Sequence, residues 1–258
     1  MHAFHLPSLD NAKLRTIIEQ VEKDCRLNTF WRCSNVMAID RMGYTDHGPT
    51  HVKIVANLGL KLIRILVEND VTPSVVKDYG MKNEDAEVIV VLGSIFHDLG
   101  MVVMREEHEI FGALLAKEFI DKFLQRIYNE EERAIMSSEI LHAIVTHEDP
   151  RKPLTVEAGV VRIADALDME KGRARIPFQA GNVDIHSVSA LSIEKVTVSK
   201  GDKKPIMVRI IMSNSAGVFQ IDELLKPRIE NSGLSQYINV IAEVTKEKES
   251  RILEKFEF

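Results

Sequence analysis

Four titratable side chains of this sequence lie on the apolar faces of expected helices, where polar groups are uncommon. They are His51, His108, His147 and Asp165. His51, for example, precedes Ile54 and Val55 by three and four residues, which puts all three on one side of a helix.

The adjacent pair His97 and Asp98 closes the most apolar segment of the chain. Burying any one of these six groups without a partner costs several kcal/mol. Their common placement therefore predicts a common partner.

A divalent metal ion would neutralise the carboxylates and satisfy the imidazole nitrogens together. Imidazole and carboxylate ligands suit Mn, Fe, Co, Ni, Zn or Mg. The two cysteines, Cys25 and Cys33, are too few for a disulfide framework and lack the spacing of a metal-binding knuckle. The residues alone therefore predict a metal site of histidine and aspartate ligands.

The elements that must position these ligands are expected to be helices. Ser8 or Asp10 is expected to cap the first one. Helical patterns continue over residues 46–69, 85–97, 107–128, 131–146 and 156–171, whereas residues 31–44 are less regular. The segment 85–97 is apolar on nearly all sides and is expected to be central, ending near Gly100.

The pattern changes after Pro177. Residues 188–198 and 206–212 are rich in β-branched side chains and flank a Lys-Gly-Asp-Lys-Lys-Pro turn, which predicts an antiparallel hairpin. Residues 222–231 suggest a short helix and 237–244 a third strand. We expect a mainly α protein, with an all-α domain over residues 1–180 and a small α+β domain over 181–258.

The bulk properties indicate a globular protein. The sequence of 258 residues is 45% hydrophobic and 28% charged, with a formal net charge of -6. That charge disfavours binding to nucleic acid or to an anionic membrane. We see no signal peptide, and the densest apolar stretch, residues 88–96, is too short to span a bilayer. A cytoplasmic protein is expected, and the hairpin domain is a candidate contact for a homo-oligomer.

The same residues carry a resemblance to the HD-domain metal-dependent phosphohydrolases. His51, then His97-Asp98, then Asp165 resemble the H…HD…D signature of that family. The segments at 96–100 (Phe-His-Asp-Leu-Gly), 108–113 (His-Glu-Ile-Phe-Gly-Ala) and 164–168 (Ala-Asp-Ala-Leu-Asp) resemble its motifs in order. The resemblance covers about residues 45–175 and implies an HD-type helical bundle.

By this resemblance, His51, His97, Asp98 and Asp165 hold a first metal ion, which activates a water molecule for attack on phosphorus. His108, His147 and Glu148 then either hold a second ion or contact the substrate phosphate. Thr146 stands where two-metal members have a histidine, which favours one ion. One or two divalent ions per chain are expected.

Further candidates surround these ligands. His47 lies four residues before His51 and could contact substrate or help to begin the helix. Three basic residues after the Asp165 segment could clamp a phosphate or form a surface cluster between domains; they are Lys171, Arg173 and Arg175.

Asp168 lies three residues after Asp165 and could orient a ligand imidazole from behind. It could equally accept a salt bridge from Arg162 or Arg173.

The expected function is hydrolysis of a phosphomonoester or phosphodiester, with a nucleotide or another small phosphorylated compound as substrate. One alternative is a regulatory HD protein that binds a nucleotide with little turnover. Another is an RNA-processing phosphodiesterase. The complete first ligand set favours catalysis, and the acidic net charge disfavours the RNA reading.

Overall fold

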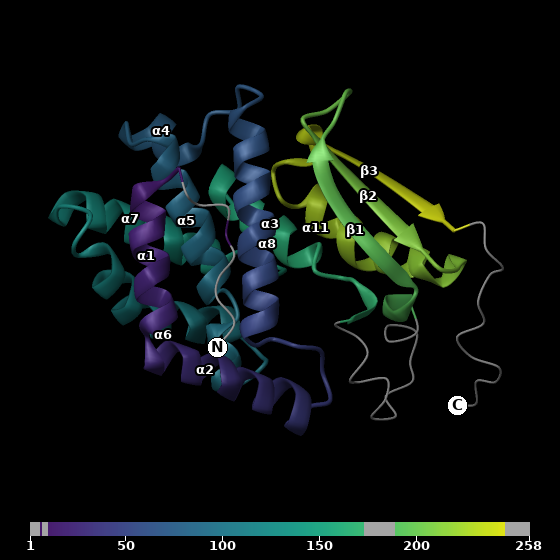
Figure 1. The fold of residues 1–258 in the computed structure, drawn as a ribbon, viewed down its shortest axis with the longest axis horizontal. Coiled ribbons are helices and arrows are strands. Elements are labelled where there is room, and N and C mark those ends of the chain that lie inside the picture. Colours follow the sequence, from purple (N-terminus) through teal and green to yellow (C-terminus); the bar gives the residue numbers. More distant parts are fainter. Residues whose placement is uncertain (1–5, 7–9, 173–188, 246–258) are drawn as a thin grey trace.

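A computed structural model of the chain describes residues 6, 10–172 and 189–245. It has a helical part (residues 10–172) and a C-terminal part (residues 189–245), whose small sheet lies at one end of the helices (Figure 1). The predicted fold class, a helical bundle followed by a small α+β part with an antiparallel hairpin, is confirmed.

The helical part contains the predicted helices with ends shifted by a few residues. Its helices are α1 (Ala12–Lys23), α2 (Cys25–Asn35), α3 (Pro49–Val67), α4 (Ser74–Tyr79), α5 (Asn83–Phe96), α6 (His108–Leu124), α7 (Glu130–Val145) and α8 (Val156–Ala166). The segment 31–44 is more regular than expected, because α2 runs directly into a π-helix, η1 (Val36–Arg41). Asp24 caps α2 by accepting from the Leu27 N–H at 2.9 Å.

Helix α5 lies at the centre of the bundle, as its sequence predicted. Every residue from Val88 to Phe96 is buried, because α3, α7 and α8 pack around it (Figure 1). A helix with apolar side chains on all sides can bury them all only in such a central position. Its carboxyl end is therefore enclosed by neighbouring helices.

Three local expectations need correction. The first helix is capped by Asn11, whose Oδ1 accepts from the Leu14 N–H at 3.0 Å; Asp10 is not the cap, and Ser8 lies outside the described residues. Helix α5 ends at Phe96 rather than near Gly100, and a short 3-10 helix, η2 (Leu99–Val102), follows. Ile54, expected on the apolar face beside His51, is 39% exposed.

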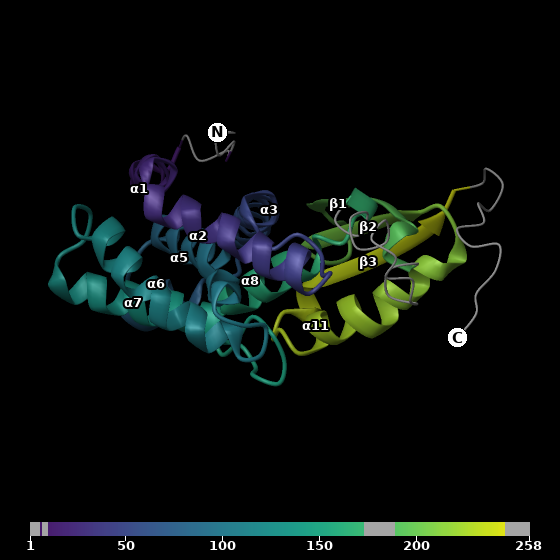
Figure 2. The same ribbon diagram turned by 90° about the horizontal axis from the view of Figure 1, so that it is seen from below.

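The C-terminal part is a three-stranded sheet of β1 (Ile193–Lys200), β2 (Ile206–Met212) and β3 (Ile238–Val244) in that order. Strands β1 and β2 form the predicted hairpin, which starts at Ile193 rather than at 188, a residue outside the described part. The predicted third strand is present and runs parallel to β2. A parallel pair requires a crossover, which η4 (Gln220–Leu225) and α11 (Lys226–Glu230) provide along one face of the sheet (Figure 2).

The two parts share one continuous cluster of buried apolar side chains. Strands β1 and β2 contact α3, and α11 contacts α8. The domain boundary expected at residue 180 lies outside the described residues and stays a prediction. The docking of α11 on α8 brings the C-terminal part next to a helix that carries a predicted metal ligand.

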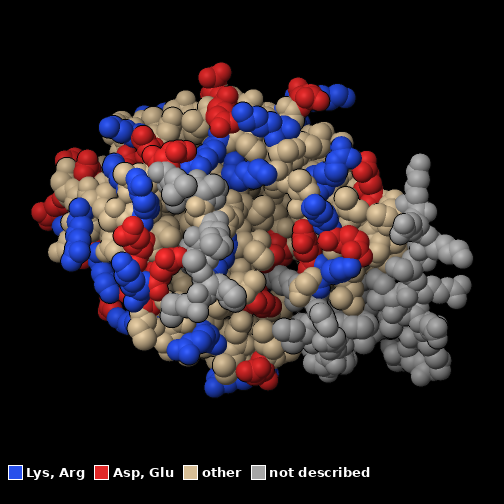
Figure 3. Space-filling view, in the orientation of Figure 1, with Lys and Arg blue, Asp and Glu red and all other residues tan. Residues whose placement is uncertain are grey.

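The surface carries charges of both signs. On the face in Figure 3, acidic and basic side chains are interspersed, and neither sign forms a continuous patch. In the described part of the chain, every helix is too short or too polar to span a bilayer.

Candidate metal centre

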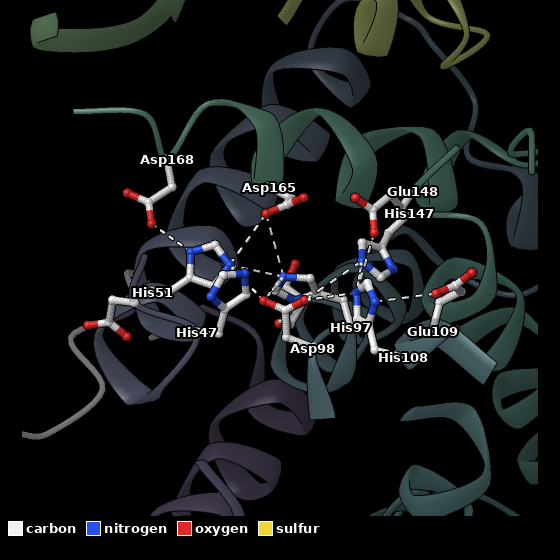
Figure 4. Close-up of polar contacts among 12 residues, drawn as sticks. His47, His51, His97, Asp98, His108, Glu109, His147, Glu148, Asp165 and Asp168 are labelled. Carbon is white, nitrogen blue, oxygen red and sulfur yellow. Dashed lines mark hydrogen bonds and ion pairs between the residues drawn. The ribbon is translucent and has the colours of Figure 1, made fainter. Parts of the chain in front are cut away.

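The ligands predicted for a first metal ion lie together where helix ends converge (Figure 4). His51 is the third residue of α3, His97 and Asp98 follow the last residue of α5, and Asp165 lies in the last turn of α8. We call these four residues the first cluster. The carboxyl ends of α5 and α8 bring partial negative charge to it, and the amino end of α3 brings partial positive charge.

The ligand atoms of the first cluster are spaced for a metal ion. The Nε2 atom of His51 lies 3.1 Å from His97 Nε2, 3.2 Å from Asp98 Oδ2 and 3.3 Å from Asp165 Oδ1. His97 Nε2 lies 3.2 Å from Asp98 Oδ2 and 3.6 Å from Asp165 Oδ1. Ligands on metal bonds of about 2.0–2.2 Å are themselves about 2.9–3.6 Å apart, so these five separations suit ligands of one ion.

Hydrogen bonds behind the two imidazoles show which nitrogen of each ring faces the centre. His51 Nδ1 donates to Asp168 Oδ2 at 2.6 Å, and His97 Nδ1 donates to the Ser94 carbonyl at 2.8 Å. These oxygens only accept, so each Nδ1 carries a hydrogen, and the neutral form of each ring presents its lone pair at Nε2.

Two lone pairs 3.1 Å apart repel each other unless a positive charge lies between them. Beside them, Asp98 Oδ2 is buried without a hydrogen-bond partner among the described residues. A metal ion would satisfy all these atoms at once, so the residues present fit such an ion.

The pKa values show the same demand for positive charge. Burial alone would lower the pKa of His97, but the carboxylates of Asp98 and Asp165 outweigh it and raise that pKa to about 9. Burial would raise the pKa values of both aspartates, but the neighbouring imidazoles hold them well below the usual range. Without an ion, a proton on His97 supplies the charge, and binding of a metal would release that proton.

The predicted residues His108 and His147 form a second cluster next to the first. His108 begins α6, and His147 follows the end of α7 by two residues rather than lying on the helix. Their Nε2 atoms are 3.2 Å apart, and Asp98 Oδ1 lies 3.3 Å from His108 Nε2 and 3.8 Å from His147 Nε2. Asp98 therefore places one carboxylate oxygen in each cluster.

His147 is a neutral imidazole. Its Nδ1 donates to the Ile144 carbonyl at 2.7 Å, which leaves Nε2 as the acceptor. Burial, together with the charges of His97 and His108, lowers the pKa of His147 to about 3. The ring can therefore bind a metal ion or accept a hydrogen bond at neutral pH.

The second cluster can be satisfied in two ways because His108 has two partners on one nitrogen. Its Nδ1 lies 2.9 Å from the Arg105 carbonyl and 2.8 Å from Arg105 Nη1. If Nδ1 donates to the carbonyl, Nε2 is free to bind a cation. If Nδ1 accepts from the guanidinium, Nε2 carries the proton and donates to His147 Nε2. Only the first cluster requires a cation, and both expected roles of the second stay open.

Two glycines of the recognised motifs bring His108 to the centre. A Cβ at Gly100 would lie 1.9 Å from the His108 carbonyl oxygen and 2.5 Å from the Gly112 nitrogen. A Cβ at Gly112 would lie 3.2 Å from the Gly100 nitrogen. Contact between η2 and α6 is thus possible only without side chains at these positions.

Glu148, predicted to complete the second ligand set, is held by two arginines. Both of its carboxylate oxygens accept from Arg105, at 2.7 and 2.8 Å, and Arg228 lies 3.2 Å away. Burial would raise the pKa of Glu148, but the Arg105 hydrogen bonds outweigh it and lower the pKa to about 2. Glu148 Oε2 is still 3.6 Å from His108 Nε2, so the residue borders the second cluster as a compensated charge.

Arg105, Glu109 and Arg228 were missed by the sequence reasoning. Glu109 is buried beside His108, 3.3 Å from its Nδ1, and forms an ion pair with Arg151. Arg105 and Glu109 flank His108 in the sequence, and that proximity was a usable signal. Arg228 lies in a segment without any recognised motif, so no local signal pointed to it.

The remaining candidates have different surroundings. His47 precedes α3 instead of lying on its face, because the helix begins at Pro49, yet its ring centroid is 5.8 Å from that of His51. Its backbone N–H donates to Asn35 Oδ1 at 2.9 Å and its Nδ1 to the Thr45 carbonyl at 2.7 Å. His47 therefore lies at the edge of the first cluster.

The basic residues after α8 are not gathered at the centre in the described part of the chain. Lys171 pairs with Glu194 on β1 at 2.5 Å, and Arg173 and Arg175 lie outside the described residues. Asp168 accepts a hydrogen bond from His51, as expected of a carboxylate that orients a ligand imidazole.

Arg162, the other residue considered for Asp168, bonds instead to Asp149 and to the backbone carbonyls of Thr146 and Arg151. It is fully buried. This arginine therefore fixes the loop that carries His147 and Glu148.

Comparison with known proteins agrees with this geometry. The sequence pattern of the family described as HD domain matches residues 50–170, a range that includes the whole first cluster. An uncharacterized protein of Methanocaldococcus jannaschii is 46% identical over 234 residues, which cover 91% of this chain and 90% of that protein. The second comparison extends the likeness through most of the C-terminal part.

Proposed function

Because the chain belongs to the HD-domain superfamily of metal-dependent phosphohydrolases, we propose that it hydrolyses a small phosphate ester, such as a nucleotide, with a divalent ion held in the first cluster. The observation that carries this proposal is the pair of Nε2 atoms of His51 and His97, which lie 3.1 Å apart beside the carboxylates of Asp98 and Asp165. Mn, Fe, Co, Ni, Zn and Mg all suit these ligands.

A divalent ion at this position supplies an activated water and polarises the phosphoryl group. His51, His97, Asp98 and Asp165 would hold it. Asp168 keeps the His51 proton on Nδ1, and the Ser94 carbonyl does the same for His97. These bonds keep both Nε2 atoms directed at the ion.

The second cluster can move protons in this reaction. His147 Nε2 is unprotonated at neutral pH, and His108 Nε2 carries a proton when its Nδ1 accepts from Arg105. The pair can then donate a proton from His108, while the low pKa of His147 makes it a weak base. This role fits a one-ion enzyme, and occupation by a second ion is the other use of the same atoms.

A small substrate also suits the surface. The formal net charge is -6, and the charges on the face in Figure 3 are interspersed without a continuous positive patch for a nucleic acid backbone. This supports a nucleotide or a related ester over RNA.

The direct test combines metal analysis with a screen of phosphomonoesters and phosphodiesters in added Mn, Mg, Co or Ni. Asp98→Asn should lose both the bound ion and hydrolysis, whereas the control Asp222→Asn on η4 should keep both. Metal-free wild type in every preparation, with unchanged stability of Asp98→Asn, would contradict the proposal. Bound metal without turnover of any ester would favour the regulatory alternative.

A further inference from the structure

One arginine of the C-terminal part lies at the metal centre. Arg228 lies on α11, and its side chain is 18% exposed. Its Nη1 donates to the His147 carbonyl at 2.5 Å, and its Nη2 donates to Glu148 Oε1 at 3.2 Å. The same Nη1 lies 3.7 Å from Asp165 Oδ2. The contact of α11 with α8 therefore carries a cation to the edge of the first cluster.

Arg228 stands beside a first-cluster ligand without being bonded to it. A separation of 3.7 Å is too long for a hydrogen bond. Asp165 directs its other oxygen, Oδ1, at His51 and His97. A guanidinium has more N–H donors than the two bonds to His147 and Glu148 use, so Arg228 keeps donors for a further acceptor at this edge.

The other cations near the centre are engaged elsewhere. Arg105 gives both terminal nitrogens to Glu148, Arg151 pairs with Glu109, and Lys171 pairs with Glu194 on β1. Within the described ranges, Arg228 is the Lys or Arg side chain that comes within 4 Å of a first-cluster carboxylate.

The chemistry of the proposed reaction favours a further cation beside the metal ion. A phosphate ester brings negative charge to a centre that already contains the carboxylates of Asp98, Asp165 and Glu148. A guanidinium can donate to two phosphate oxygens at once, in a geometry that an ammonium cannot match.

We propose that Arg228 binds the phosphoryl group of the substrate, so that the C-terminal part completes the active site. This inference rests on the proposed function of the first cluster. The small sheet and its crossover helix would then serve to position one guanidinium beside Asp165.

The test is calorimetric titration of inorganic phosphate into protein loaded with Mn²⁺. Arg228→Ala is compared with Arg228→Lys and with Arg209→Ala, which removes an exposed β2 arginine paired with Glu243 at 2.9 Å. Metal affinity and melting temperature are measured for each variant. We expect Arg228→Ala to weaken phosphate binding by about 10- to 100-fold, Arg228→Lys to lie between it and wild type, and Arg209→Ala to match wild type.

The metal affinity of Arg228→Ala should not fall below the wild-type value, because Arg228 is a cation 3.7 Å from Asp165 and does not itself favour binding of a metal ion there. Phosphate binding by Arg228→Ala equal to that of wild type would overturn this inference and leave the proposed function standing. Loss of metal affinity in parallel with phosphate affinity would also overturn it, since Arg228 would then only support the loop at His147. Failure of metal-loaded wild type to bind phosphate would contradict the proposed function itself.

Discussion

Removal of the Asp168 carboxylate is expected to weaken metal binding, although Asp168 is not a ligand. Asp168 Oδ2 accepts the Nδ1–H of His51 at 2.6 Å, and its side chain is 7% exposed. The bond fixes the ring so that Nε2 faces the ion, and the carboxylate makes that nitrogen a stronger donor to the metal. Such partners are worth about 10- to 100-fold in metal affinity, which corresponds to about 1.4–2.7 kcal/mol.

Asp168→Ala and Asp168→Asn should reduce the metal affinity by different factors. Asp168→Ala removes the acceptor altogether, and because the bond is short and buried, the loss should lie near the upper end of that range. Asp168→Asn keeps an oxygen that can accept from Nδ1 but loses the charge, so the loss should be nearer tenfold. Competition with a chromophoric chelator at fixed pH measures both affinities.

Glu170→Ala is the matched control for the loss of one negative charge. Glu170 is exposed and accepts from the Val196 N–H at 2.8 Å, away from the imidazoles. The affinity of the Glu170→Ala protein for the ion should equal that of wild type. An Asp168→Ala protein that binds metal as tightly as Glu170→Ala would refute the reasoning, and so would an Asp168→Asn protein weaker than Asp168→Ala.

Two further predictions concern stability. Gly100→Ala should lower the free energy of unfolding by about 3 kcal/mol or more, since its Cβ would meet the His108 carbonyl. The control Gly172→Ala, whose Cβ would have no atom within 4 Å, should change that free energy by less than about 0.5 kcal/mol. Equal denaturant midpoints for the two variants would show that η2 and α6 are not in such close contact. Burial and the charge of Glu157 raise the pKa of Glu139, so the folded protein holds this proton more tightly than the unfolded chain and loses stability as pH rises above the ordinary glutamate pKa. Glu139→Gln should therefore be more stable than wild type at about pH 8, by up to about 1 kcal/mol, and equal to it below about pH 4; urea titrations showing the same difference at both pH values would contradict this.

The burial and clustering of the candidate ligands could be predicted from the sequence because their signal is local. A titratable residue in register with apolar neighbours, as at Asp165, must be buried when the helix packs, and burial demands a partner. His147 was found by the same reasoning even though the helix ends two residues before it. The pairing of His97 with Asp98 needed only their adjacency at the end of the central helix.

The surroundings of the ligands could not be read in this way. Arg228 reaches the centre because α11 docks on α8, a contact between segments far apart in the chain. The ion pairs that occupy Glu148 depend on side chains from three separate segments. Sequence spacing shows which groups will be buried, but the partner of each group depends on tertiary packing.

The carboxylate of Asp98 makes the two histidine clusters thermodynamically dependent on each other. Its Oδ2 faces His51 and His97, and its Oδ1 faces His108. A cation at one oxygen withdraws electron density from the other, so occupation of the first position lowers the affinity of the second for a further cation. By linkage the reverse holds with the same factor. If the second cluster also binds an ion, titration with a divalent ion should show two unequal steps, and the stoichiometry found for the protein will depend on the free concentration of the ion.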